Sequence, residues 1–317
     1  MSTQVNSSIS AGGDRVFTNA GTPVDNFTLN RIFKELQSKD ETTREKAAKN
    51  LKEYLVTISR DVSSTDQLSV YNNFINKRIF NLINSSDMSA QLGGTQAINA
   101  MVDLITNVNG NPALPQLALS TTAEENSNMI TRYASYLRRL LSSKNMTVMK
   151  TAISTLGNLA IPGSSLTGDF VEFETKRSLE WFVSEKVESK RHAAVLILSS
   201  LAYNAPTLLY PYIKDVLANI GLGLRAPLPA MRADTALGLR NCLVIVYERD
   251  TELRNYWFTK LYGEALSVFR SITTTTNGSS NKTDDPFSMA PRLSLNASNS
   301  PPEFIHGSLL CYRELIL

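Results

Sequence analysis

The sequence is poor in the side chains that most catalytic and metal sites use. Its 317 residues include only two cysteines, Cys242 and Cys311, and two histidines, His192 and His306. A zinc site needs several closely spaced Cys or His ligands, and a Ser-His-Asp or Cys-His device needs a positioned histidine. Both cysteines lie in apolar runs, which favours small core residues over a disulfide. The sequence therefore predicts no metal site and no cofactor.

Long apolar runs and a strong net charge are also missing. The longest unbroken apolar runs, 193–198 and 242–247, have six residues each, whereas a membrane-spanning helix needs about 20. The first eight residues have neither the basic segment nor the apolar segment of a signal peptide, which predicts a cytosolic protein. A net charge of +3 is too weak to indicate a nucleic acid or an anionic membrane as the partner.

The motifs of phosphoryl-transfer enzymes are absent from this sequence. It contains no Walker-type glycine-rich loop, no Gly-x-Gly-x-x-Gly fingerprint and no kinase His-Arg-Asp element. The nearest match to a kinase Asp-Phe-Gly element is Asp169-Phe170, which Val171 follows instead of glycine. No residue of the chain is therefore a catalytic or cofactor-binding candidate.

Three segments lack apolar periodicity and are rich in Ser, Thr, Asn, Gly and Pro: residues 1–27, roughly 107–127 and roughly 272–302. They are predicted to be a disordered N-terminal tail and two flexible insertions. Between them, apolar residues recur at intervals of three and four, as in 47–55, which is the helical period. No stretch outside the insertions alternates as a strand would. The chain is predicted to be all-α.

One helix pattern recurs six times along the chain. It has a starting residue, often small residues at offsets two and three, and a large apolar or aromatic residue at offset seven. The starting residues are Arg44, Gln91, Met149, Arg191, Arg232 and Ile305. Without the insertions, the copies are roughly 43 residues apart, within the roughly 40–47 of helical-pair repeats. The sequence predicts a HEAT-like α-solenoid of about six helical pairs over residues 28–317.

Glycine and capping residues fit this repeat. The pair Gly93-Gly94 would let helices of neighbouring repeats approach closely. The alternative is a phosphate-binding loop, but no strand precedes the pair and no Lys-Ser/Thr follows it. We therefore expect a packing notch. Asp40 and Asp87 precede two of the starting residues and are expected to cap the helix N-termini.

The arginines of the pattern are the first candidates for a binding site. Arg44, Arg191 and Arg232 each begin one copy and would project from equivalent faces of their helices. One interpretation is an arginine ladder that bonds to the preceding loop or the neighbouring repeat. The other is a partner-binding ridge on the concave surface. His192 and His306 also hold equivalent positions, which favours hydrogen bonds between repeats over catalysis.

A run of aromatic residues is the second candidate. Tyr256, Trp257 and Phe258 are consecutive, and three consecutive side chains cannot all face one side of a helix. At least one of them is expected to be exposed. The run is therefore a candidate contact for a protein partner.

Three stretches carry a more specific signal. They are 169–181 (DFVEFETKRSLEW), 190–198 (KRHAAVLIL) and 304–310 (FIHGSLL). These strings resemble the N-terminal HEAT region of the target of rapamycin (TOR) serine/threonine protein kinases, and the likeness extends from about residue 31 to 317. The departures from the family are the long tail and the insertion near 272–302.

The resemblance implies a growth and nutrient signalling kinase of the phosphatidylinositol-kinase-related class, whose N-terminal solenoid is a scaffold for partner subunits. Its kinase domain would lie outside this chain, so no catalytic residue is carried over. By resemblance, the partners are a raptor-type subunit and a second TOR protomer. The implied location is cytoplasmic, with peripheral association with endomembranes within a larger complex. The alternatives are a free-standing HEAT-repeat adaptor for transport or complex assembly, and an unrecognised enzyme.

The C-terminal stretch 309–317 is apolar on more than one side of its expected helix. A solenoid normally ends in a repeat with a polar outer face. We therefore expect the isolated chain to self-associate unless further repeats cover this edge.

Overall fold

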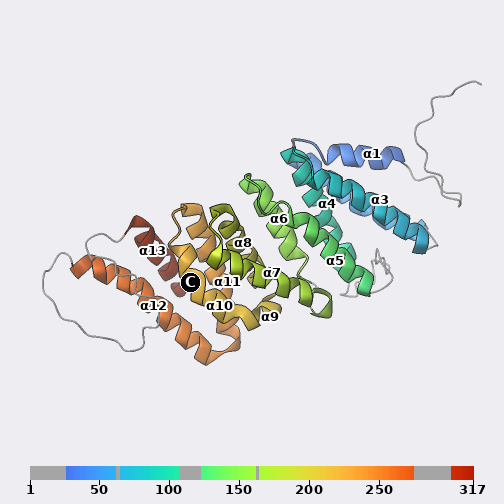
Figure 1. The fold of residues 1–317 in the computed structure, drawn as a ribbon. Coiled ribbons are helices and arrows are strands. Elements are labelled where there is room, and N and C mark those ends of the chain that lie inside the picture. The colour runs from blue at the N-terminus through green and yellow to red at the C-terminus, as the bar shows by residue number, and fades with distance from the viewer. Residues whose placement is uncertain (1–25, 62–64, 107–122, 162–163, 275–300) are drawn as a thin grey trace, which may run out of the picture. The chain divides into compact units, whose positions relative to one another are not determined.

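The structure, a computed structural model, describes residues 26–61, 65–106, 123–161, 164–274 and 301–317. All regular secondary structure in these ranges is helical, so the predicted all-α class is confirmed. Figure 1 labels the helices. In chain order they are α1 (Asn26–Glu35), α2 (Glu41–Asp61), α3 (Thr65–Ile83), α4 (Met88–Thr106), α5 (Ala123–Arg138), α6 (Met146–Asn158), α7 (Ser164–Ser184), α8 (Glu188–Asn204), α9 (Pro206–Leu209), the 3-10 turn η1 (Tyr210–Tyr212), α10 (Ile213–Leu224), α11 (Pro229–Arg249), α12 (Thr251–Thr274) and α13 (Pro302–Ile316).

The predicted repeat agrees with these helices. Each of the six starting residues is the fourth residue of its helix, and those helices are α2, α4, α6, α8, α11 and α13. The helix before each of them completes a helical pair: α1–α2, α5–α6, α7–α8, α10–α11 and α12–α13. Helices α3 and α4 form the sixth pair, in contact at Gly94. The predicted six pairs are therefore confirmed within the described residues. We call α2, α4, α6, α8, α11 and α13 the second helices.

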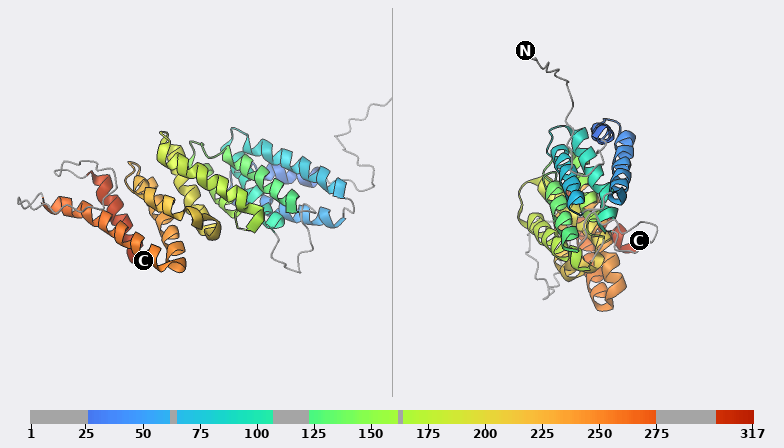
Figure 2. Two further views of the ribbon diagram at one scale, coloured as in Figure 1. Left: turned by 60° about the horizontal axis from the view of Figure 1, so that its bottom comes forward. Right: turned by 90° about the vertical axis from the view of Figure 1, so that its right-hand side faces the viewer.

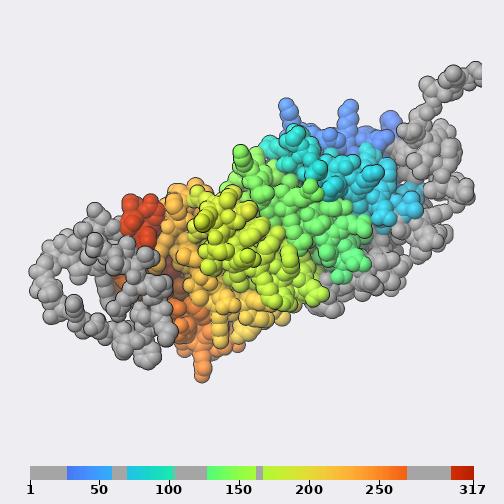
Figure 3. Space-filling model, in the orientation of Figure 1, coloured from blue at the N-terminus to red at the C-terminus, as the bar shows by residue number. Residues whose placement is uncertain are grey.

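The chain divides into two compact units. The first contains α1 to α3 and nearly all of α4, and the second contains α5 to α13. In the second unit the second helices pack in chain order, with α6 on α8, α8 on α11 and α11 on α13. The first helices α5, α7 and α10 also pack in order, so this unit has two helical layers (Figure 2). Its successive repeats appear as adjacent bands of colour in Figure 3.

Glycine at offset two makes the closest contacts with the backbone of another repeat among the described glycines. A Cβ on Gly93 of α4 would lie 1.8 Å from the carbonyl oxygen of Leu36, just after α1. A Cβ on Gly307 of α13 would lie 2.0 Å from the carbonyl oxygen of Leu224, at the end of α10. In both units, a second helix thus packs directly on the backbone at the end of the first helix of the preceding repeat. The expected packing notch at Gly93-Gly94 is confirmed, since Gly94 also packs against α3.

The expected limits of the irregular segments differ from the helix bounds by a few residues. Helix α1 begins at Asn26, within the expected tail, and α5 begins at Ala123, within the first expected insertion. Helix α12 continues to Thr274, and α13 begins at Pro302. Apolar periodicity misses these turns because terminal turns carry exposed side chains, such as Phe27. The rest of the predicted tail and insertions lies outside the described residues.

One further finding concerns the length and hydropathy of the helices. Within the described ranges, no single helix is both long and apolar enough to cross a membrane. One pair of helical segments, Glu188–Asn204 and Pro206–Leu224, is bent by 120° and meets the criteria for a membrane span by length and composition only.

The glycine contact predicts the effect of a single methyl group. We expect Gly307→Ala to lower the free energy of unfolding by about 1–3 kcal/mol, because the new Cβ must displace backbone rather than a flexible side chain. Gly263→Ala in α12 is the matched control, since no atom lies within 4 Å of its Cβ position. That variant is expected to raise stability by up to about 1 kcal/mol through helix propensity. Denaturant unfolding measures both, and equal stability of the two variants would contradict the packing argument.

Candidate functional site

The repeat arginines bind the loop before their own helix. Arg44 Nη1 donates hydrogen bonds to the carbonyl oxygens of Ser38 and Lys39, both at 2.9 Å. Arg232 Nη1 donates to Ala226 at 2.7 Å and Pro227 at 2.8 Å, which are the same two offsets. Both arginine side chains are buried. The ladder interpretation therefore describes these two residues, and a partner contact through them stays a prediction.

Gln91 shows that the bond to the preceding loop requires a hydrogen-bond donor at the starting position and not arginine in particular. Its Nε2 donates to the carbonyl oxygen of Ser85 at 2.8 Å, again six residues back. Arg191 is half-buried, and its Nε has no hydrogen-bond partner among the described residues. That atom is itself buried, as is the unpartnered Nε of Arg44, so a partner contact through Arg191 also stays a prediction.

Helix caps stand four residues before the starting residues, as expected. Asp40 Oδ2 accepts the backbone N–H of Thr43 at 2.8 Å, and Asp87 Oδ2 accepts that of Ala90 at 2.9 Å. Hydrogen bonds from Thr43 and Thr42 lower the pKa of Asp40 to about 2. Asn145 Oδ1 caps α6 in the same way. Cap and donor together fix the starts of α2 and α4, and the Asn145 cap fixes that of α6.

Both histidines bond to a neighbouring repeat. His192 Nε2 lies 2.7 Å from Asp234 Oδ2, and Lys150 Nζ lies 2.9 Å from the same oxygen. His306 Nδ1 accepts a hydrogen bond of 2.8 Å from Arg232 Nε. Burial raises the pKa of Asp234, but the hydrogen bonds from His192 and Lys150 lower it more, so the net pKa lies below its ordinary value. The histidines link repeats, as the sequence predicts.

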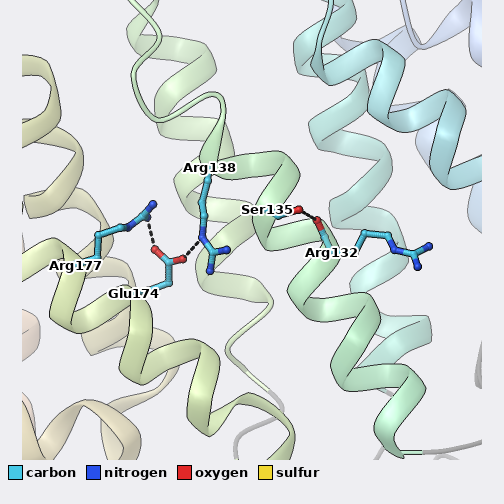
Figure 4. Close-up of polar contacts among 5 residues, drawn as sticks. All are labelled: Arg132, Ser135, Arg138, Glu174 and Arg177. Carbon is cyan, nitrogen blue, oxygen red and sulfur yellow. Dashed lines mark hydrogen bonds and ion pairs between the residues drawn. The ribbon is translucent and has the colours of Figure 1, made fainter.

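A buried glutamate joins two first helices of the second unit. Glu174 of α7 has a fully buried side chain. Arg138 Nε of α5 donates to its Oε1 at 2.6 Å, and Arg177 Nη2 of α7 donates to its Oε2 (Figure 4). The Arg138 guanidinium also lies 4.6 Å from the centre of the Phe173 ring. This cluster leaves one positive charge uncompensated at a surface that carries an exposed aromatic ring.

A second cluster of the same kind joins two second helices. The side chain of Glu314 in α13 is fully buried, and its Oε2 accepts a hydrogen bond of 2.6 Å from Arg240 Nε of α11. Its Oε1 accepts one of 2.7 Å from Arg313 Nε. Both arginine side chains are about half exposed. The sequence analysis missed both glutamates. Each could be recognised in the sequence as an acidic residue on the apolar face of a helix. Glu174 lies three residues after the buried Val171, and Glu314 lies three residues after the buried Cys311.

The aromatic run has one side chain available to a partner. Tyr256 is exposed, whereas Trp257 is buried. The two rings meet edge to face at 5.2 Å, and Lys260 Nζ lies 4.8 Å from the Trp257 ring. Phe258 is half-buried. Tyr256 is therefore the residue of this run through which a contact is expected.

The cysteines and the metal-binding residue types add no reactive group to these clusters. Burial raises the pKa of both Cys242 and Cys311 to about 12. Within the described ranges, no three His, Cys, Asp or Glu side chains gather as metal ligands would. The chemistry that the described clusters offer is therefore recognition by arginine and aromatic side chains, rather than bond cleavage.

The chain is similar to TOR kinases over most of its length. It is 35% identical over 297 residues to the serine/threonine-protein kinase TOR2 of Saccharomyces cerevisiae, a match that covers 91% of this chain. It is 32% identical over 283 residues to tor1 of Schizosaccharomyces pombe, and 28% identical over 290 residues to TOR of Arabidopsis thaliana. The chain spans about 10% of the length of these curated relatives. No family model matches it.

The resemblance to the TOR kinases is thus confirmed. The chain corresponds to a helical, non-catalytic part of these proteins, and their kinase domain lies elsewhere. Among solved structures, it is similar to a designed armadillo repeat protein at 14% identity with a TM-score of 0.38, covering 90% of this chain and 99% of that one.

The buried glutamate yields a stability prediction. Glu174→Gln is expected to lower the free energy of unfolding by about 2 kcal/mol, because Arg138 and Arg177 then lose the carboxylate that neutralises them. Glu172→Gln on the same helix is the control, since Glu172 forms an exposed pair with Lys176. Its melting temperature is expected to equal that of the wild type. Thermal unfolding measures both, and an unchanged melting temperature for Glu174→Gln would contradict the assigned role.

Asp234 yields a pH prediction. Because its pKa in the folded state lies below the ordinary 3.8, its contribution to stability is complete above that pH. The contribution is lost as the pH falls further and the folded carboxylate is protonated. Asp234→Asn is therefore expected to lower the melting temperature by about 2–4 °C at neutral pH. The difference from wild type should shrink below about pH 4. A difference that stays constant down to pH 2.5 would show that the carboxylate charge is not involved.

Proposed function

We propose that this chain is the non-catalytic N-terminal scaffold arm of a TOR-type serine/threonine protein kinase, and that it binds partner subunits of a growth and nutrient signalling complex. The observation that carries the proposal is the similarity to TOR kinases over 91% of the chain. Kinase motifs are absent from its sequence. The arm acts by presenting surface rather than by catalysis.

The described clusters support a binding role. Arginines held by buried glutamates keep their outward N–H groups in fixed positions, so a partner carboxylate meets little ordering cost. Exposed aromatic side chains such as Phe173 and Tyr256 add contact area. In the proposed complex the partners are a raptor-type subunit and a second TOR protomer. The complex is cytoplasmic and associates peripherally with endomembranes.

The native protein tests this proposal. An antibody raised against this chain is expected to purify a polypeptide about ten times longer than the chain, consistent with the 10% share of its relatives. The purified protein should phosphorylate serine or threonine substrates and should contain a raptor-type subunit. Mass spectrometry and a kinase assay read out both results. The pre-immune serum is the control.

The same experiment also distinguishes the scaffold arm from the alternative function, a free-standing adaptor. A free-standing adaptor would be recovered near the 35.0 kDa of this chain, with no kinase activity. That result would contradict the scaffold-arm proposal. A long kinase recovered without any raptor-type subunit would contradict the partner assignment alone.

A further inference from the structure

The second helices of the second unit pack in one shared register. At each interface between adjacent second helices, the residue eight positions after one starting residue contacts the residue nine positions after the other. The Gly157 Cβ position meets Ser200, Asn241 Nδ2 donates to the Ser199 carbonyl at 3.1 Å, and Arg240 binds Glu314. The same two positions therefore meet at three successive interfaces, from α6 to α13. Residues at any one offset consequently lie in a line across the stack.

Offset twelve carries an exposed apolar side chain in each of these repeats. Ile161 follows α6 and is 55% exposed, Tyr203 of α8 is 76% exposed, and Val244 of α11 is 50% exposed. Leu317, after α13, holds the same offset and is also exposed. We call Ile161, Tyr203 and Val244 the apolar row. Single exposed apolar residues are ordinary, but repetition at one offset places Tyr203 and Val244 in a line, and Ile161 lies in the turn that continues α6.

Arginines border the row on the α11 and α13 side. Arg240 lies one helical turn before Val244 and is 43% exposed, and Arg313 of α13 is 53% exposed. Their shared carboxylate, Glu314, is buried, so a partner meets the guanidinium groups and not the negative charge. Arg254 lies 5.1 Å from the ring of Tyr247, which is next along the same side of α11. Glu248 of α11 and Glu252 of α12 are the exposed acids beside them. Cations therefore outnumber accessible carboxylates along this border.

The spacing of the row selects the shape of its partner. Packed helices lie about 8–10 Å apart, so the row offers an apolar side chain at about that interval. Two turns of an α-helix, seven residues, rise about 10.5 Å and return a side chain to the same face. In an extended strand, residues on one face are about 6.6 or 13 Å apart, which does not match. A helix aligned with the stack therefore fits better than an extended segment.

We propose that the apolar row, with its arginine border, is a docking surface for an amphipathic helix of a partner protein whose apolar residues recur every seven positions and whose flanks are acidic. This inference rests on the proposed scaffold function and specifies its partner. The occupant is chosen by charge complementarity to Arg240 and Arg313 and by the repeat spacing.

A designed peptide serves as the probe. It is a fluorescein-labelled helix of about three heptads, with leucine at one position of each heptad, glutamate on both sides of that position and alanine elsewhere. We expect it to bind the 317-residue chain in fluorescence anisotropy. A second peptide, with every glutamate replaced by lysine, is expected to bind at least about tenfold more weakly.

The protein variants locate the site. Tyr203→Ser with Val244→Ser removes two members of the row and is expected to weaken peptide binding at least about tenfold. Tyr262→Ser with Val183→Ser is the matched control, because it removes an exposed tyrosine and an exposed valine from the first helices α12 and α7. The control is expected to bind like the wild type. Circular dichroism melting of both double variants confirms that each is folded.

Three results would overturn the proposal. The first is equal binding of the glutamate and lysine peptides, and the second is equal binding by the row and control variants. The third is sedimentation in which the row variant loses self-association while no peptide binds, since the occupant is then a second copy of the chain. A raptor-type subunit recovered with the native kinase alongside any of these results would leave the proposed function standing and reject this docking site alone.

Discussion

The close approach of each second helix to its neighbours is the constraint on which the rest of the structure depends. At Gly93 and Gly307 only a hydrogen atom separates the helix from a carbonyl oxygen of the preceding repeat. Such contact admits one register, because a shift by one residue would drive a side chain into backbone. A fixed register is what aligns equal offsets across the second unit. The linear arrangement of surface side chains is therefore a consequence of packing in the core.

Polar side chains reinforce the same register at more than one place along the helices. At the N-terminal end, Arg44 and Arg232 bind the loop before their helix. His192 bonds to the next repeat and His306 to the preceding one. Further along, Arg240 in the middle of α11 binds Glu314 in the last turn of α13 across the interface. These are charge-assisted hydrogen bonds in partly buried places, where directional geometry is strict. They specify which repeat stacks on which, whereas apolar contacts alone would tolerate several partners.

The repeat itself could be predicted from the sequence because its signal is redundant. Small residues, caps and large apolar residues recur together, and the six predicted starting residues each fall on the fourth residue of a helix. The buried clusters could not be predicted in the same way. Glu174 and Arg138 are 36 residues apart and belong to different helical pairs, so only tertiary packing brings them together. The mixed charges around Glu174 resemble a solvated helix surface when they are considered along the chain alone.

The candidate residues show why position in a repeat and function are different questions. The pattern that identifies Arg44 and Arg232 also explains them, because a donor at that offset satisfies loop carbonyls in three of the repeats. A side chain that the fold requires has its hydrogen bonds occupied and is a poor choice for partner recognition. Offset twelve is the opposite case, since none of the contacts described within the stack involves the apolar residue there and four of the described repeats still expose one. Exposure of apolar area costs solubility, and a partner that covers it recovers that free energy. The surface positions that repeat without a structural requirement are therefore the ones that carry information about what the scaffold binds.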